Sequence, residues 1–144
     1  MARGARQRRL GPGGVMSALA IRAMRCKGWR WMPGMLADGI RVIRVVDGHP
    51  VGVGSVIETG ELFEVRMRGD VRPCLADHAT LGCLLALVRE AWDGADYGIT
   101  TCAPMHPGDH WEAVGFADPN DGPTCCSAGE SEAGALVAAL EGAP

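Results

Sequence analysis

The sequence predicts a single α+β domain in which an antiparallel sheet of about five strands, a meander plus a hairpin, packs with three helices. At 144 residues the chain has room for one such domain. The segment Thr80–Trp92 is nearly all apolar and predicts a buried helix. Residues 40–68 hold three β-branched runs separated by short turns, which predicts the meander. Ser131 precedes a second apolar helix that ends near Gly142.

The N-terminal end divides into an arm and a first helix. Residues 1–14 are rich in Arg and Gly, so we expect a disordered basic arm, with the domain covering residues 15–144. The first helix is expected at Met16–Lys27 and ends at Gly28, which can take the left-handed conformation. The apolar face of this helix carries Met16, Leu19, Ala20, Ala23 and Cys26.

The meander is expected as the strands Ile40–Val46, Val51–Ile57 and Leu62–Arg68. In the third strand, apolar residues alternate with charged ones, which predicts one buried and one wet face. The apolar members are Phe63, Val65 and Met67. We expect the helix Thr80–Trp92 to pack on them.

Two helices and a hairpin complete the prediction. Asp77 is a good N-cap for the helix that follows it. A second hairpin is expected from Tyr97–Cys102 and Trp111–Phe116, followed by a long loop over residues 117–129. Ser131 caps the last helix, which runs through Leu140.

Charge is distributed unevenly along the chain. Eight of the fourteen basic residues precede residue 31, and ten carboxylates but no Lys or Arg follow Arg89. A basic arm can touch the phosphates of nucleic acid, but the C-terminal carboxylates would repel the same phosphates. We therefore expect nucleic-acid binding to be weak and salt-sensitive at most.

No apolar run reaches the ~18 residues needed to cross a bilayer, and the N-terminal segment lacks the pattern of a signal peptide. We expect a cytoplasmic protein without a membrane partner, whose six cysteines are reduced thiols. The sequence contains no motif that predicts a cofactor.

One segment has ligand types and spacing that suit zinc. Cys102, His106 and His110 are spaced four residues apart. Pro104 and Pro107 lie between them and restrict the backbone, and no Cys-x-x-Cys pair accompanies them. We interpret the segment as a hairpin loop and expect no metal, with these three residues as the metal candidates to test.

A second segment combines cations with aromatic rings. Such a surface can form a hot spot for a partner or stack on exposed bases. The alternative, which we favour, is that both Trp rings cap the core where the first helix meets the sheet. The candidate partner-binding residues are Arg25, Lys27, Trp29, Arg30 and Trp31.

Three segments together resemble a family of small uncharacterised phage and prophage proteins. The first contains Cys-x-Gly-Trp-Arg-Trp-Met-Pro-Gly-Met (26–35), and the second contains Leu-Gly-Cys-Leu-Leu-Ala-Leu-Val-Arg-Glu-Ala-Trp (81–92). The third is the C-terminal helix with its Gly-Ala-Pro end (130–144). The order of elements is distantly similar to small phage α/β sandwich domains. The resemblance implies an accessory protein and transfers no catalytic residue.

No catalytic constellation accompanies these segments, so we expect a protein that is not an enzyme. The expected function is that of a phage-type accessory protein that binds a macromolecule. We expect this macromolecule to be a protein. Interference with a host process such as defence is one role of this kind. The alternative function is a small zinc-binding or nucleic-acid-binding module.

Overall fold

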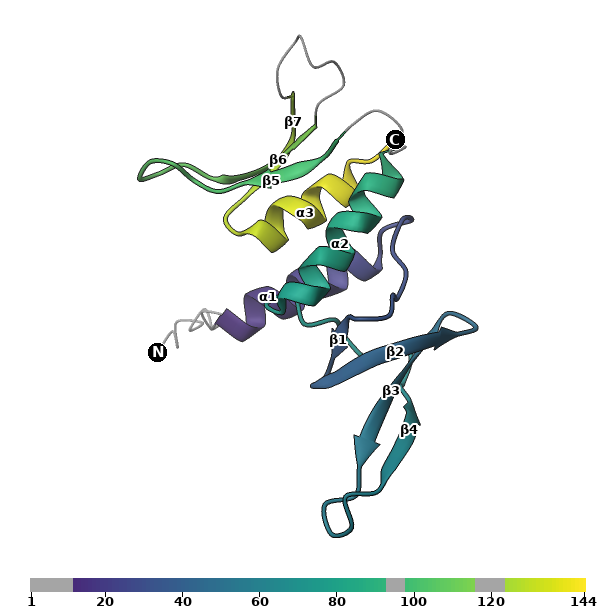
Figure 1. The fold of residues 1–144 in the computed structure, drawn as a ribbon. Helices are drawn as coiled ribbons and strands as arrows, with labels where there is room; N and C mark the ends of the chain where they lie inside the picture. The colour runs from purple at the N-terminus through teal and green to yellow at the C-terminus, as the bar shows by residue number, and fades with distance from the viewer. Residues whose placement is uncertain (1–11, 93–97, 116–123) are drawn as a thin grey trace, which may run out of the picture.

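The computed structural model describes residues 12–92, 98–115 and 124–144, and this part of the chain is α+β (Figure 1). The described elements are α1 (Pro12–Met24), β1 (Leu36–Ala37), β2 (Ile40–Val46), β3 (His49–Ser55), β4 (Leu62–Arg66), α2 (His78–Ala91), β5 (Thr100–Cys102), β6 (Trp111–Gly115), β7 (Thr124–Gly129) and α3 (Glu132–Glu141). The described strands form two antiparallel sheets, with orders β1-β2-β3-β4 and β5-β6-β7.

The fold class is confirmed, but the prediction of one sheet with about five strands is wrong. The meander and the C-terminal hairpin belong to separate sheets, and two further strands, β1 and β7, extend them. The predicted loop over residues 117–129 contains β7 in the part that the structure describes. Its small residues give little strand signal, and β7 is held instead by pairing with β6 and by packing against α3.

The central helix of the fold is α3 rather than α2. It packs against β5, β6 and β7 on one side and against α1 and α2 on the other (Figure 1). Four alanines and a glycine in its ten residues let these neighbours approach closely. The side chains buried on α3 are Ala133, Ala135, Leu136, Val137, Ala139 and Leu140. Ser131 caps the helix and accepts from the Gly134 N–H at 3.0 Å, as predicted.

The predicted packing of α2 on the meander is wrong. Leu84, Leu87 and Val88 are buried on α2, whose main packing partner is α3, and the Trp92 indole N–H donates to the Ala139 carbonyl at 2.8 Å. Phe63, expected under α2, is 48% exposed. Alternation along a strand predicts which side chains share a face but not which element covers that face.

The N-terminus of α2 is tied to the first sheet by a buried hydroxyl. Asp77 is the N-cap, as predicted, and accepts from the Thr80 N–H at 2.9 Å. The fully buried Thr80 hydroxyl donates to Asp77 and accepts from the Leu36 N–H of β1. The Arg41 guanidinium of β2 donates to both Asp77 oxygens, at 2.6 and 3.1 Å. Asp77 thus joins the start of α2 to β2, and Thr80 joins it to β1.

The pH dependence of stability is expected to report on Asp77. Hydrogen bonds from Arg41, and then from Thr80, hold the pKa of the Asp77 carboxyl well below its usual range. A lowered pKa stabilises the fold above the unfolded pKa of about 3.9, and this contribution is lost as the pH falls through the folded pKa. Asp77→Asn keeps a good cap but removes the charge. In denaturant titrations, the stability difference between wild type and Asp77→Asn should stay constant above about pH 5 and shrink as the pH falls below it.

A second substitution, Asp77→Ala, separates the contribution of the helix cap to stability from the contribution of the charge. Asp77→Ala also removes the cap and should cost about 1 kcal/mol more than Asp77→Asn near neutral pH. Equal stability of the wild type and Asp77→Asn at every pH would show that the ion pair contributes nothing.

The first helix is longer at its N-terminus than predicted. It begins at Pro12, four residues before Met16, and ends at Met24. Pro12 suits the first turn of a helix, where its missing N–H has no partner to lose. Residues 12–14 of the predicted arm therefore belong to α1, and residues 1–11 lie outside the described residues.

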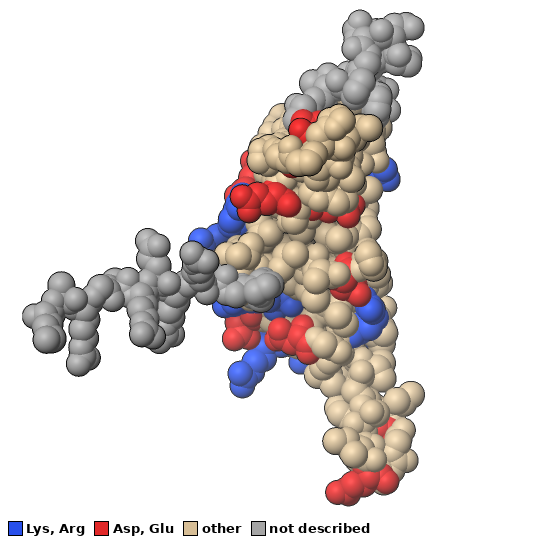
Figure 2. Space-filling view, turned by 90° about the vertical axis from the view of Figure 1, so that its left-hand side faces the viewer, with Lys and Arg blue, Asp and Glu red and all other residues tan. Residues whose placement is uncertain are grey.

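The β3–β4 hairpin projects away from the helices (Figure 1), and the face of it that Figure 2 shows is largely uncharged, with acidic side chains near the end. Two glycines of β3 leave space for side chains that lie across the strand. A Cβ at Gly54 would meet the Phe63 ring at 2.8 Å, and a Cβ at Gly52 would meet the Met67 methyl at 2.7 Å. Phe63 and Met67 therefore lie on one face, but only Met67 reaches the core.

In the described part of the chain, no helix is long and apolar enough to cross a membrane.

Candidate partner-binding groove

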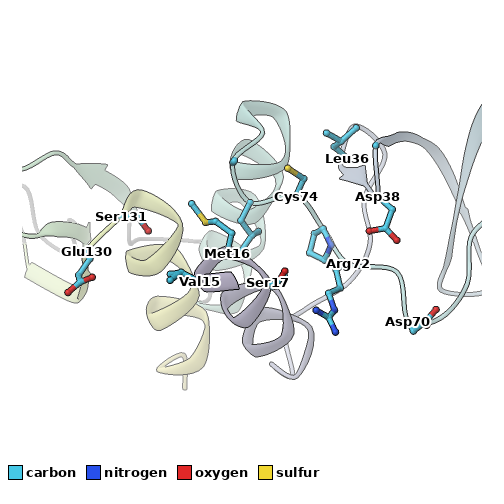
Figure 3. A pocket seen from close by; sticks show the side chains of 15 residues that line it. Val15, Met16, Ser17, Leu36, Asp38, Asp70, Arg72, Cys74, Glu130 and Ser131 are labelled. Carbon is cyan, nitrogen blue, oxygen red and sulfur yellow. The ribbon is translucent and has the colours of Figure 1, made fainter. Parts of the chain in front are cut away.

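A groove of about 1130 Å³ runs beside α1, and we call it the α1 groove (Figure 3). The middle of the groove is apolar. Val15 and Met16 of α1 lie between the start of α3 at one end and the segments 36–39 and 70–76 at the other. The fully buried Leu75 contributes to its lining. Four segments that are separated in sequence therefore build one concave surface.

The ends of the α1 groove are mainly acidic. Glu130 lies at one end, and Asp38, Asp70 and Arg72 lie at the other (Figure 3). All four side chains are exposed. The described lining thus has three carboxylates and one guanidinium, a balance that favours a cationic ligand. None of these residues was predicted, because no local motif indicates a groove that forms only when distant segments meet.

Chemically, the α1 groove can bind and orient but offers little for catalysis. Its described lining contains no histidine. The lining residues with nucleophilic atoms are Ser17, Cys74 and Ser131, and none of them has a hydrogen bond to a general base among the described contacts. A ligand here would be held by apolar contact in the middle and by ionic contact at the ends.

The structure separates the five predicted partner-binding residues. Trp31 is buried in the core and cannot offer a ring face to bases. Trp29 packs partly buried against the same core and meets Trp31 edge to face, with ring centroids 5.5 Å apart. This arrangement agrees with the favoured interpretation, in which the rings cap the core, although they do so beside α2 and α3. Arg25 and Lys27 are exposed.

Lys27, Trp29 and Arg30 do share a pocket of about 520 Å³. Its charge is balanced, because Glu90 and Glu141 line it too and Arg30 pairs with Glu90 at 2.6 Å. The Trp29 indole N–H is buried and has no partner among the described atoms. This pocket is smaller than the α1 groove and lacks a charge preference, so we rank it second. Partner binding by these residues stays a prediction.

The three candidate metal ligands lie on the hairpin between β5 and β6. Cys102 ends β5, and His106 and His110 follow in the connecting loop, all with exposed side chains. The His106 N–H donates to the Asp109 carboxylate at 2.9 Å, which fixes a turn. Within the described residues, no group of three His, Cys, Asp or Glu side chains gathers as metal ligands would.

The purified protein is expected to carry no stoichiometric zinc. Tetrahedral zinc needs four ligands within about 2.0–2.3 Å, and a loop restrained by Pro104 and Pro107 would have to fold back to supply them. Elemental analysis after extensive dialysis checks this expectation. About one zinc per chain, lost together with stability in Cys102→Ser and in His110→Ala, would establish a structural metal site instead.

Burial also sets the reactivity of two thiols. It raises the pKa of Cys26 and of Cys83 above the ordinary value. Cys83 donates to the Pro33 carbonyl at 3.6 Å, and so helps to hold the turn after Trp31 against α2. A thiol with a raised pKa is a poor nucleophile near neutral pH, which is consistent with a packing role for both residues.

No family model, curated protein or solved structure matches this chain.

Proposed function

We propose that this chain is a non-enzymatic accessory protein, of the phage type that its sequence resembles, and that it binds a segment of another protein in the α1 groove. The observation that carries this proposal is the combination of an apolar middle with acidic ends in the α1 groove. A fitting segment has apolar side chains flanked by Lys or Arg. Interference with a host process is one use of such binding.

The size of the α1 groove favours a peptide segment over a small molecule. Its volume of about 1130 Å³ exceeds the ordinary range of small-molecule sites, about 300–1,000 Å³. The groove also runs from residues 130 and 131 past α1 to the segments 36–39 and 70–76, so its shape suits a peptide segment that lies along it. Hot spots for such segments are apolar anchors that fill a pocket.

Selection from a random peptide library against the immobilised protein tests this proposal. Enriched peptides should carry an apolar centre with basic flanks. Asp70→Lys and Glu130→Lys should each weaken their binding about ten-fold, because each replaces an attractive charge with a repulsive one. Glu112→Lys, an equally exposed change on β6, is the matched control and should leave the binding unchanged.

Two outcomes count against the α1 groove. Selection of peptides without basic flanks, or an equal loss of binding in Glu112→Lys, would show that binding is elsewhere or is only electrostatic.

A chain without residues 2–11 gives a further check, because that segment carries four arginines and precedes α1. Tighter peptide binding by the shortened chain would show that the chain's own N-terminus competes for the groove.

A further inference from the structure

The outer edge of β4 has no strand beside it among the described residues. The first sheet ends at β4, which pairs with β3 alone. Apolar side chains stand exposed on this hairpin. Leu62 is 71% exposed and Ile57 at the tip is 99% exposed. Natural sheets protect such edges with proline, bulges or inward charges, and the register of β4 shows neither a proline nor a bulge.

The backbone of β4 directs every second residue toward this edge. The Met67 N–H donates to the Pro50 carbonyl at 3.0 Å, and the Val56 N–H donates to the Glu61 carbonyl at 2.9 Å. Odd-numbered residues of this strand therefore use their backbone groups within the hairpin. Leu62, Glu64 and Arg66 turn theirs outward, where a further strand can bind them.

We propose that β4 is a self-association edge, at which two copies of the chain pair antiparallel about a two-fold axis beside Val65. The two four-stranded sheets then form one continuous sheet. The partner at this edge is thus a second copy of the same chain, and this proposal goes beyond the binding function of the α1 groove.

Charge selects this register over its neighbours. In a continuous sheet, residues that face each other lie on the same face, so odd-numbered residues of β4 must face odd-numbered residues of the second copy. The two-fold axis therefore lies beside a residue and not between two residues. A two-fold axis at Glu64 sets Glu64 against its own copy, and an axis at Arg66 does the same for Arg66. Like charges directly opposite are unfavourable. An axis at Val65 sets Glu64 opposite Arg66 of the second copy, twice by symmetry.

Apolar contact selects the same register. An axis at Val65 sets the exposed Phe63 of one copy opposite Met67 of the other. Met67, with Ile40, Val65 and Val71, lines a hollow of about 310 Å³ at the base of the hairpin. The Phe63 ring of each copy thus lies beside the hollow of the other copy, and the contact occurs twice. An isologous interface has this reciprocal form.

Sedimentation velocity tests the proposal over protein concentrations of about 1 μM to 1 mM. The wild type should show a concentration-dependent dimer. Glu64→Arg and Arg66→Glu should each weaken the dimer about ten-fold, because each sets two pairs of like charges face to face. An equal mixture of the two variants should form a heterodimer. One copy then presents arginine at both positions and the other presents glutamate at both, so each facing pair joins opposite charges.

A control separates the edge from the internal ion pair of the hairpin. Glu64 also pairs with Arg44 of its own β2. Arg44→Gln removes that pair and leaves β4 unchanged, so it should dimerise as the wild type does. Phe63→Ser should weaken the dimer without unfolding the chain, since the ring is already about half exposed. Circular dichroism of each variant confirms that the fold is kept.

Cross-linking reports the register directly. Facing residues in a non-hydrogen-bonded antiparallel pair lie about 4.5 Å apart at Cα, which suits a disulfide. Val65→Cys should therefore give a covalent dimer under mild oxidation, with peptide mapping showing residue 65 joined to residue 65. Arg66→Cys faces Glu64 of the second copy and should not join to itself.

Three results would overturn the proposal. The first is a wild type that stays monomeric throughout the concentration range. The second is a dimer that neither charge reversal weakens, which places the interface elsewhere. The third is failure of the mixed variants to restore the dimer, which contradicts the register. These readouts measure mass and cross-links, so they are independent of whether the α1 groove binds a peptide.

Discussion

Replacing Leu84 by Ala is expected to lower the free energy of unfolding by about 2–5 kcal/mol. Leu84 is fully buried on α2, the helix that packs against α3, and it belongs to the hydrophobic core. Shortening this side chain in a packed core forfeits the transfer free energy of the lost carbons and leaves a cavity that neighbours fill only partly. Urea unfolding, followed by circular dichroism and fluorescence, measures the change.

The neighbouring Leu85 is the matched control for this prediction. From the sequence, both leucines lie on the apolar helix predicted at Thr80–Trp92, and replacing either by alanine carries the same expected cost. In the structure Leu85 is only partly buried, so Leu85→Ala should cost clearly less than Leu84→Ala. A loss below about 1 kcal/mol for Leu84→Ala would show that α2 is peripheral to the core.

A side chain at Gly129 is expected to destabilise the fold by about 3 kcal/mol. Gly129 ends β7, and a Cβ there would lie 2.5 Å from the Ala135 nitrogen and 2.6 Å from the Gly134 carbonyl carbon. Both neighbours are backbone atoms of α3, so neither can turn aside as a flexible side chain would. Gly129→Ala should therefore push β7 away from the central helix.

Gly82 provides a control of opposite sign. It lies inside α2 and is exposed, and a Cβ there would meet no described atom within 4 Å apart from its chain neighbours and the backbone of its own helix. Gly82→Ala should stabilise the protein by about 0.5–1 kcal/mol, because alanine loses less backbone entropy in a helix. Thermal unfolding of Gly129→Ala, Gly82→Ala and the wild type measures both changes in stability. Equal effects at both positions would contradict the close contact of β7 with α3.

Local chemistry in the sequence determined where most elements begin and how they are capped. The β-branched run Ile40–Val46 matches β2, and the caps Asp77 and Ser131 start α2 and α3 as predicted. These features depend on neighbours a few residues apart. A cap needs only its own side chain and the N–H groups of the next turn, and so a single sequence is enough to find it.

Only the tertiary structure decided which faces meet. The small residues of β7 carry no strand signal of their own and become a strand beside β6, with α3 packed against them. The alternation along β4 predicts Phe63 as a core residue, yet it is 48% exposed, on a hairpin that projects away from the helices (Figure 1).

The candidate site depends on tertiary structure for the same reason. Met16, Asp70 and Glu130 line one groove although they come from widely separated parts of the chain. The sequence by itself determines how residues are patterned along each element. Which residues face each other across the α1 groove, or at the edge of β4, follows from how the elements pack, because burial is shared between segments that do not adjoin in the chain.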